Sequence, residues 1–345
     1  LILWPGAADA PAMMPDWVGV SLVQFTCFML FWAMNIWLIW KGINSIRILE
    51  HVAAPFLLLC GLALLAWAYQ GANGFGPMLQ AGSKFKEPAE FWNLFWPSLT
   101  AMVGFWATLT LNISDFTRYA KNQRAQVIGQ LSGLPSTMTL FAFIGVAVTS
   151  ATIIIFGEAI WDPVVLVRRF ESHTLVFFSM IAVIIATIST NTAANIVSPT
   201  NDFQNVFPKL INQKRGTLMT GLVGILLMGW ELLIKSGMVE SAVSVESMYS
   251  NWLLSYSSLL GPIAGIMIVD YFLIKKQSLD LISLYKKDGC YPGFNPAGFI
   301  ALACPVGLTI IALLTGTMMW FYSYGWFTGS LLGGIIYYLV SPKNK

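Results

Sequence analysis

One stretch of the chain, residues 179–208, combines an apolar run with closely spaced hydroxyl and amide side chains. Its polar side chains cluster within nine positions and are Thr187, Ser189, Thr190, Asn191, Thr192 and Asn195. Inside a lipid bilayer each of these groups needs a hydrogen-bonding partner from protein, water or a ligand. We therefore expect the stretch to face an interior cavity and to line a transport site.

One face of this predicted helix has the chemistry of a cation site. The spacing i, i+3, i+4, i+7 brings together Ala186, Ser189, Thr190 and Ala193. The two hydroxyl oxygens can coordinate a hard cation, and the small alanines would let backbone carbonyls of a neighbouring broken helix approach. The alternative is structural, because Ser and Thr also join membrane helices through hydrogen bonds.

A second face of the same helix carries amide groups. Thr187, Asn191 and Asn195 fall at i, i+4, i+8. An amide side chain offers N–H donors and a carbonyl acceptor, which match the C(=O)–NH edge of a heterocycle. Hydrogen bonding between helices is again the alternative. We expect Pro199 and Pro208 to end the helix and to shape the loop that follows.

Another candidate stretch, residues 91–112, is an apolar run interrupted by Gly104 and Asn112. Transporters built from inverted repeats place their binding sites at broken helices near the membrane midplane. Trp106 follows the glycine by two positions, and its indole offers a flat face for stacking a planar ring. Because the chain has 14 tryptophans, packing or anchoring at the lipid interface is the alternative for this one.

Charged residues in or beside the apolar runs are interpreted as structural. Glu231 and Lys235 are spaced i, i+4 and predict an ion pair near a helix end, with proton coupling as the alternative. Asp270 is predicted to be a structural residue in the last turn of its helix. Asp115 and Arg118 are predicted to form a structural or gating pair.

The composition is that of a membrane protein with many spans. Of the 345 residues 57% are hydrophobic and 10% are charged, and the mean hydropathy is +0.69. Two histidines, His51 and His173, are expected at loop edges and leave little for acid–base catalysis. The cysteines form no CxxC pair, and no basic patch carries interleaved aromatic residues. We therefore predict no enzyme activity, no cofactor and no nucleic-acid partner.

Nine apolar runs are long enough to cross a hydrocarbon core of about 30 Å. They cover residues 17–40, 52–70, 91–112, 136–157, 174–198, 217–235, 250–274, 297–318 and 320–340. With the loop of Lys41 and Arg47 in the cytoplasm, all but five of the 19 basic residues fall on the cytoplasmic side. Those five are Lys84, Lys86, Arg168, Arg169 and Lys235. The positive-inside rule then predicts a cytoplasmic C-terminus and an external N-terminus.

Residues 1–345 are expected to form a single transmembrane domain, because neither a short repeat nor a low-complexity linker divides them. The chain begins with Leu1, and no signal peptide precedes its first span. An external N-terminus without a signal peptide predicts that earlier spans precede this sequence in a longer protein.

Four stretches spread over most of the chain resemble the nucleobase:cation symporter-1 family, which includes bacterial hydantoin, allantoin and uracil permeases. They are WKGINSIRILEHVAAP at 40–55, GFWATLTLNISDFTRY at 104–119, STNTAAN at 189–195 and GPIAGIMIVDY at 261–271. The resemblance implies the leucine-transporter type of fold, with two inverted five-helix repeats and two further helices. The nine spans here would then be the fourth to the twelfth of that family.

The resemblance also implies a substrate site. Trp106 would stack on the substrate ring and Asn195 would hydrogen-bond it, while Gly104 and Phe105 would line the pocket. We add Asn191, which shares a helix face with Asn195.

A cation site is implied as well, with the carbonyl of Ala186 and the hydroxyls of Ser189 and Thr190 as ligands for sodium. The family's first and third helices, which complete both sites, are absent from this sequence. We therefore predict that these 345 residues alone do not transport.

The overall prediction is a cation-coupled symporter for a nucleobase or related cyclic amide, such as uracil, cytosine, allantoin or hydantoin. We expect a monomer in the plasma or inner membrane, with a sodium ion or a proton as the coupling ion. The alternatives are a carrier of amino acids or amines with the same fold, and a non-functional truncated product. The sequence leaves open which nucleobase or ureide is carried and which cation drives it.

Overall fold

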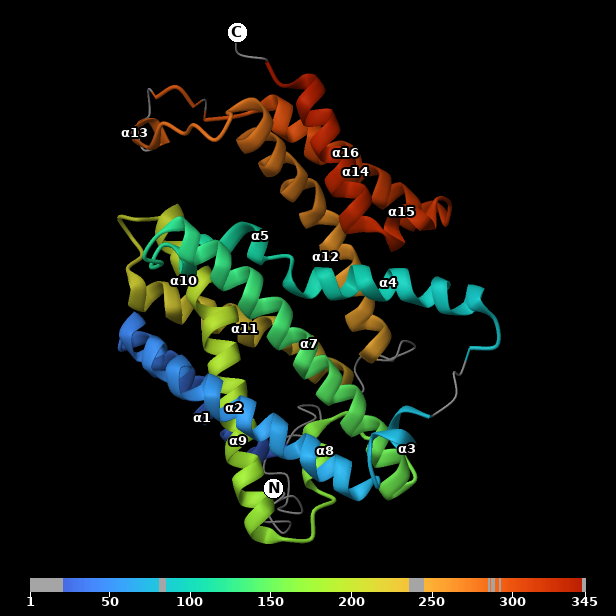
Figure 1. The fold of residues 1–345 in the computed structure, drawn as a ribbon. Helices are drawn as coiled ribbons and strands as arrows, with labels where there is room; N and C mark the ends of the chain where they lie inside the picture. Colours follow the sequence, from blue (N-terminus) through green and yellow to red (C-terminus); the bar gives the residue numbers. More distant parts are fainter. Residues whose placement is uncertain are drawn as a thin grey trace. The chain divides into compact units, whose positions relative to one another are not determined.

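The computed structural model describes residues 21–80, 85–235, 245–284, 286, 289–291 and 293–342, with no side-chain description at 43 and 228–249. All regular structure in these residues is helical (Figure 1). The described helices that are long and apolar enough to cross a membrane are Leu22–Trp40, Asn44–Gly71, Pro88–Asn112, Gln123–Phe156, His173–Val206, Ser250–Ile274 and Pro296–Thr315. The predicted all-α class with many spans is confirmed.

The two remaining predicted spans also lie on helices. Residues 217–235 fall on α11 (Gln213–Lys235), and residues 320–340 fall mainly on α16 (Gly325–Val340), a shorter apolar helix. The ion pair predicted between Glu231 and Lys235 lies outside the described side chains, so it stays a prediction.

The chain forms two compact units, each of which combines two separate parts of the sequence. Unit 1 consists of Leu1–Gly82 and Thr117–Ser241, and unit 2 of Ser83–Phe116 and Ala242–Lys345. The short helix α6 (Ser114–Thr117) lies at their boundary. The expectation of a single transmembrane domain stays a prediction.

Unit 1 is built around the helix pair α2 and α7, which lie side by side (Figure 1). Its helices are α1 (Leu22–Trp40), α2 (Ile43–Gly71), α3 (Phe75–Leu79), α7 (Gln123–Phe156), α8 (Pro163–Val167), α9 (His173–Asn191), η3 (Thr192–Val197), α10 (Ser198–Val206) and α11. Ala68 on α2 and Ala147 and Ala151 on α7 are fully buried in the core of the unit. Small side chains let two membrane helices approach closely. Such close packing holds the helices together, because lipid provides no hydrophobic force between them.

Unit 2 is held together by glycines on α12 (Val245–Ile268) and α16. Its other helices are α4 (Pro88–Trp106), α5 (Leu109–Asn112), η4 (Val269–Ile274), α13 (Leu281–Leu284), α14 (Pro296–Thr315) and α15 (Met319–Ser323). A Cβ atom on Gly265 would lie 1.9 Å from the carbonyl oxygen of Ser330, and one on Gly329 would lie 2.8 Å from Cδ of Pro262. Only glycine permits this approach of the two backbones.

Several helices begin earlier than the apolar runs predict. α2 begins at Ile43 rather than residue 52, and α7 at Gln123 rather than residue 136. Hydropathy marks the lipid-facing part of a helix, whereas polar first turns extend beyond it. The side chain of Asn122 caps α7 by accepting a hydrogen bond of 2.8 Å from the backbone N–H of Ala125. His173 begins α9 as expected, but His51 lies inside α2 and not at a loop edge.

The predicted end of the polar helix at Pro199 is wrong. The helix continues from His173 to Val206, through α9, η3 and α10, and it ends before Pro208. A proline normally clashes with the carbonyl four residues earlier. Here the π-helix η3 precedes Pro199, and a π turn is wider than an α turn because its hydrogen bonds reach five residues back.

Candidate substrate and cation site

Ser189 on α9 is held by a carboxylate of a neighbouring helix. It is 5% exposed, and its Oγ donates a hydrogen bond of 2.8 Å to Oε1 of Glu50 on α2. Ala186, one turn earlier, is half-buried, and Thr190 is exposed. These three residues of the predicted cation site therefore share one helical segment of unit 1, with an acidic side chain beside them.

The amide face of the same segment forms a chain of hydrogen bonds. Asn35 on α1 is 2% exposed, and its Oδ1 accepts from Nδ2 of Asn191 at 3.1 Å and from Oγ1 of Thr192 at 3.0 Å. Asn195 donates from Nδ2 to Oδ1 of Asn191 at 3.0 Å and is itself exposed. The chain of amides thus runs from a buried anchor to an exposed end.

This arrangement fixes how Asn195 can meet a ligand. One of its N–H groups is engaged by Asn191, which leaves the second N–H and the carbonyl oxygen for another partner. A donor and an acceptor side by side are complementary to a cyclic amide. The predicted shared face of Asn191 and Asn195 is confirmed by the hydrogen bond that joins them.

The π-helix η3 changes the geometry that regular helical spacing predicts. It covers Thr192–Val197, so Asn195 lies inside it while Ser189 and Thr190 precede it. A rotation of 100° per residue, which applies to an α-helix, does not hold across this segment. The angle between the cation face and Asn195 is therefore set by the π turn, a feature that nothing in the apolar periodicity indicated.

The remaining predicted site residues belong to unit 2, where the predicted helix break is confirmed. α4 ends at Trp106, and a turn at residues 107–108 separates it from α5. Phe105 is 49% exposed, Trp106 is half-buried, and their ring centroids are 5.3 Å apart in an edge-to-face arrangement. The break thus places two aromatic side chains at the end of α4, next to residues whose backbone angles remain helical.

Gly104 is buried and permits close packing of α4 on α12. A Cβ atom at this position would lie 2.0 Å from Oγ of Ser257 and 2.6 Å from the carbonyl oxygen of Leu253. The same Ser257 hydroxyl donates a hydrogen bond of 3.1 Å to the carbonyl of Thr100. This glycine therefore has a packing role in unit 2, and its predicted role in lining the pocket stays a prediction.

Sequence reasoning missed two residues of the polar face of unit 1. Glu50 is an acidic residue inside a span, and such residues are rare enough in membranes to signal a function. Asn35 is the polar residue of the apolar run FWAMNIWLIW, and that isolation was its signal. Neither residue could be paired with its partner by spacing, because Glu50 and Ser189 are 139 positions apart.

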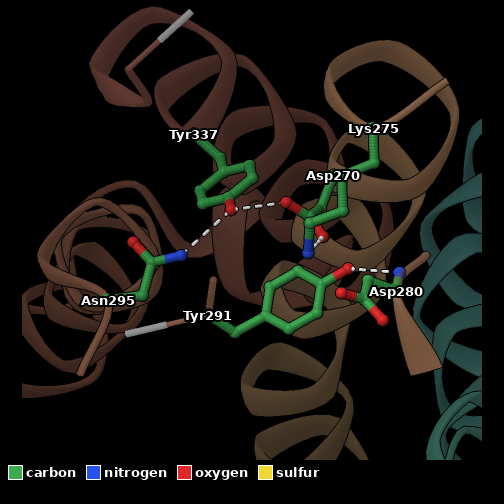
Figure 2. Close-up of polar contacts among 7 residues, drawn as sticks. Asp270, Lys275, Asp280, Tyr291, Asn295 and Tyr337 are labelled. Carbon is green, nitrogen blue, oxygen red and sulfur yellow. Dashed lines mark hydrogen bonds and ion pairs between the residues drawn. The ribbon is translucent and has the colours of Figure 1, made fainter. Parts of the chain in front are cut away.

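A second polar cluster in unit 2 confirms the structural interpretation of Asp270 (Figure 2). Its Oδ1 accepts from the hydroxyl of Tyr337 at 2.7 Å, and its Oδ2 pairs with Nζ of Lys275 at 2.6 Å. Tyr337 in turn accepts from Nδ2 of Asn295 at 3.0 Å. One carboxylate thereby ties η4 to α16 and to the start of α14.

The loop beside this cluster is joined to it by Tyr291. The ammonium group of Lys275 lies 4.7 Å from the centre of the Tyr291 ring, and the Tyr291 hydroxyl accepts from the backbone N–H of Asp280 at 2.8 Å. Hydrogen bonds from the side chain and backbone of Ser283 lower the pKa of the exposed Asp280 carboxyl. Asp115 is buried and Arg118 exposed, in different units, and their interpretation as a pair stays a prediction.

A family model described as "Permease for cytosine/purines, uracil, thiamine, allantoin" matches residues 2–336. The chain is 40% identical to the purine-uracil permease NCS1 of Arabidopsis thaliana over 99% of its own length and 58% of the relative's. It is 37% identical to the allantoin permease of Bacillus subtilis, over 98% of this chain and 67% of that protein. The chain thus spans between about half and two thirds of the length of these relatives, which are permeases rather than enzymes.

Among solved structures the chain resembles Mhp1, a nucleobase-cation-symport-1 family transporter in a closed conformation with bromovinylhydantoin bound. The TM-score is 0.67 and the identity 22%, over 97% of this chain and 72% of that one. An inward-facing conformation of Mhp1 gives a TM-score of 0.59 at 21% identity. At this identity the likeness concerns the fold, and it confirms the predicted leucine-transporter type.

Proposed function

Because this chain belongs to the family of permeases for cytosine and purines, uracil, thiamine and allantoin, we propose that the protein is a cation-coupled symporter of a nucleobase or cyclic ureide. Uracil, cytosine, allantoin and hydantoin are the candidate substrates, and the plasma or inner membrane is the proposed location. A monomer with a cytoplasmic C-terminus is part of the same proposal. The names of the relatives support the substrate class, and the residues below support the mode of binding.

The observation that carries this proposal is the amide chain from Asn35 through Asn191 to Asn195. A part-buried hydrogen bond to Asn35 orients the amide of Asn191, which in turn accepts a hydrogen bond from the exposed Asn195 amide. A pre-oriented donor and acceptor pair favours a ligand with the reverse pattern, and a neutral cyclic amide has that pattern. A charged amino acid or amine offers no such edge.

The ring of the substrate is proposed to stack on Trp106, with Phe105 and Gly104 beside it. Trp106 is the last residue of α4 and is half-buried, so part of its indole remains accessible to a ligand. Stacking of a planar ring on an aromatic side chain contributes about 1–3 kcal/mol in nucleobase complexes. That is enough to decide between a planar ring and a non-planar competitor.

The coupling cation is proposed to bind the carbonyl of Ala186 and the hydroxyls of Ser189 and Thr190. The oxygen atoms of this segment fit a hard cation such as sodium, and Ser189 is already oriented by a carboxylate. A bound cation would contribute the energy of its gradient to uphill transport. The segment of residues 186–195 would then meet both ligands, so each would favour the same conformation and increase the other's affinity.

Uptake by cells that express the protein in its full natural length tests the proposal. Radiolabelled uracil, cytosine, allantoin and hydantoin should each be tried as substrates, with proline and a quaternary amine as competitors. At least one of the cyclic amides should accumulate, and neither competitor should reduce its uptake. Accumulation of proline or the amine instead would show an amino-acid or amine carrier with the same fold.

Substitution of Trp106 tests the stacking contact. Trp106→Ala should reduce uptake and substrate affinity at least tenfold, whereas Trp92→Ala, an exposed tryptophan on the same helix, should leave both within about twofold. Normal uptake by the Trp106→Ala variant would refute the stacking role. Membrane fractionation with a tag on the C-terminus checks location and orientation in the same cells.

A further inference from the structure

Glu50 is an acidic residue within a membrane-spanning helix, and it lies against the proposed cation site. It is in the third turn of α2, inside the apolar span Asn44–Gly71, and it is half-buried. Its Oε1 accepts the hydrogen bond of 2.8 Å from Oγ of Ser189. A carboxylate at such a position is costly unless it has a function or a partner.

The basic residue one turn before Glu50, Arg47, is engaged elsewhere. Nε of Arg47 donates to Nε2 of His51 at 3.5 Å, one helical turn along the exposed side of α2. Elsewhere in the described part of the chain, Arg169 pairs with Glu158 and Lys275 pairs with Asp270. In the part of the chain that the structure describes, Glu50 is thus bonded to a neutral hydroxyl.

This hydrogen bond determines what the Ser189 hydroxyl can do. A hydroxyl has one proton and two lone pairs, and here the proton points to Glu50. The lone pairs of Ser189 are therefore directed away from Glu50, and they can be offered to a cation. A carboxylate that orients a ligand in this way also adds a negative charge near the bound ion, as the supporting residues of metal sites do.

We infer that Glu50 is a positioning residue of the cation site, which orients Ser189 and supplies the charge that the site's neutral oxygen ligands lack. This inference rests on the proposed function, because it concerns the same cation site. It assigns the site to a monovalent cation, sodium, bound with the help of one fixed negative charge. It also extends the site to a second helix of unit 1, since Glu50 is on α2 and the ligands are on α9.

Binding of sodium to the purified protein in its full natural length tests the inference without any transport measurement. The readout is the midpoint of sodium-dependent thermal stabilisation, with choline chloride replacing sodium chloride at constant ionic strength. Glu50→Gln keeps the size of the side chain and removes its charge. It should weaken the sodium midpoint about tenfold or more, as loss of a supporting residue does in other metal sites.

Three control variants separate the role in the site from general effects. Glu87→Gln removes an exposed carboxylate of unit 2 and should leave the sodium midpoint unchanged. Glu50→Asp keeps the charge but shortens the side chain by one methylene, so it should weaken the midpoint less than Glu50→Gln does. Ser189→Ala should weaken it as Glu50→Gln does, and the double variant should lose much less than the sum, because the two residues act together.

The outcomes distinguish this inference from the proposed function. The Glu50→Gln variant should still bind substrate in the absence of sodium. Quenching of tryptophan fluorescence by the candidate cyclic amides measures this binding. An unchanged sodium midpoint in Glu50→Gln would overturn the inference, as would additive losses in the double variant. If sodium does not stabilise the wild type, the inference fails, while quenching by a cyclic amide still supports the proposed substrate class. If Glu50→Gln does not fold, the Glu50→Asp and Ser189→Ala pair decides.

Discussion

Asn35 offers a test of whether a buried side chain orients the proposed substrate contact from a distance. We predict that Asn35→Leu, which removes both polar groups at similar volume, weakens substrate binding although Asn35 does not reach the exposed end of the amide chain. The substitution leaves Nδ2 of Asn191 and Oγ1 of Thr192 without the acceptor that they share. Asn191 would then be free to rotate, and Asn195, which donates to it, would lose its fixed orientation.

The magnitude follows from the hydrogen bonds that are lost. Bonds between helices in a membrane protein contribute about 0.6 kcal/mol on average and at most about 1.7. Two such bonds to a residue that is 2% exposed give a loss of stability of about 1–3 kcal/mol. An Asn195 side chain without a fixed orientation should also weaken substrate binding. We expect an affinity about tenfold lower, equivalent to about 1.4 kcal/mol of binding free energy.

The matched control is Thr192→Val, which removes one of the two donors to Asn35. It leaves the path from Asn35 through Asn191 to Asn195 intact. This variant should lose about 0.6–1.7 kcal/mol of stability and little substrate affinity. Thermal unfolding and titration of substrate by fluorescence quenching measure the two effects separately. If Asn35→Leu loses no more affinity than Thr192→Val at comparable stability, the orienting role is refuted.

Two further predictions concern unit 2. Gly265→Ala should lower stability by about 1–3 kcal/mol, because its Cβ would overlap the carbonyl of Ser330. Gly307→Ala, with open space around its Cβ, should be neutral or stabilising. Equal melting temperatures for the two variants would contradict the close approach of α12 and α16. Asp270→Asn and Tyr337→Phe should each cost about 1–3 kcal/mol, since each removes part of one partly buried network. Their double variant should cost clearly less than the sum in thermal unfolding, and full additivity would show that the two side chains act independently.

Much of the fold is predictable from the sequence, because membrane spans are specified locally. Each span satisfies its own backbone hydrogen bonds, so a long apolar run already determines a helix without reference to the rest of the chain. The break after Trp106 could also be expected locally, because Gly104, two residues earlier, has a low helix propensity. The early starts of α2 and α7 could not, because their first turns are polar and hydropathy does not register them.

In the candidate site, the residue types could likewise be predicted from local sequence, whereas their contacts could not. The residue types of the polar segment are evident in the sequence, and helical spacing separated Ser189 and Thr190 from Asn191 and Asn195. The contacts that give these residues their roles are long-range. Ser189 meets Glu50 across 139 positions, and Asn191 meets Asn35 across 156. No local pattern encodes such pairs, since they depend on which helices pack together.

The sequence by itself therefore determined the class of molecule, the order of its spans and the chemical types that line the polar face. Only the tertiary structure decided that this face is anchored by Asn35 on α1 and flanked by Glu50 on α2. Only the structure shows that η3 is a π-helix, through which the chain passes Pro199 without ending the helix. Composition and periodicity are local properties of a helix, whereas the orientation of a hydroxyl or an amide is set by the neighbour that it touches.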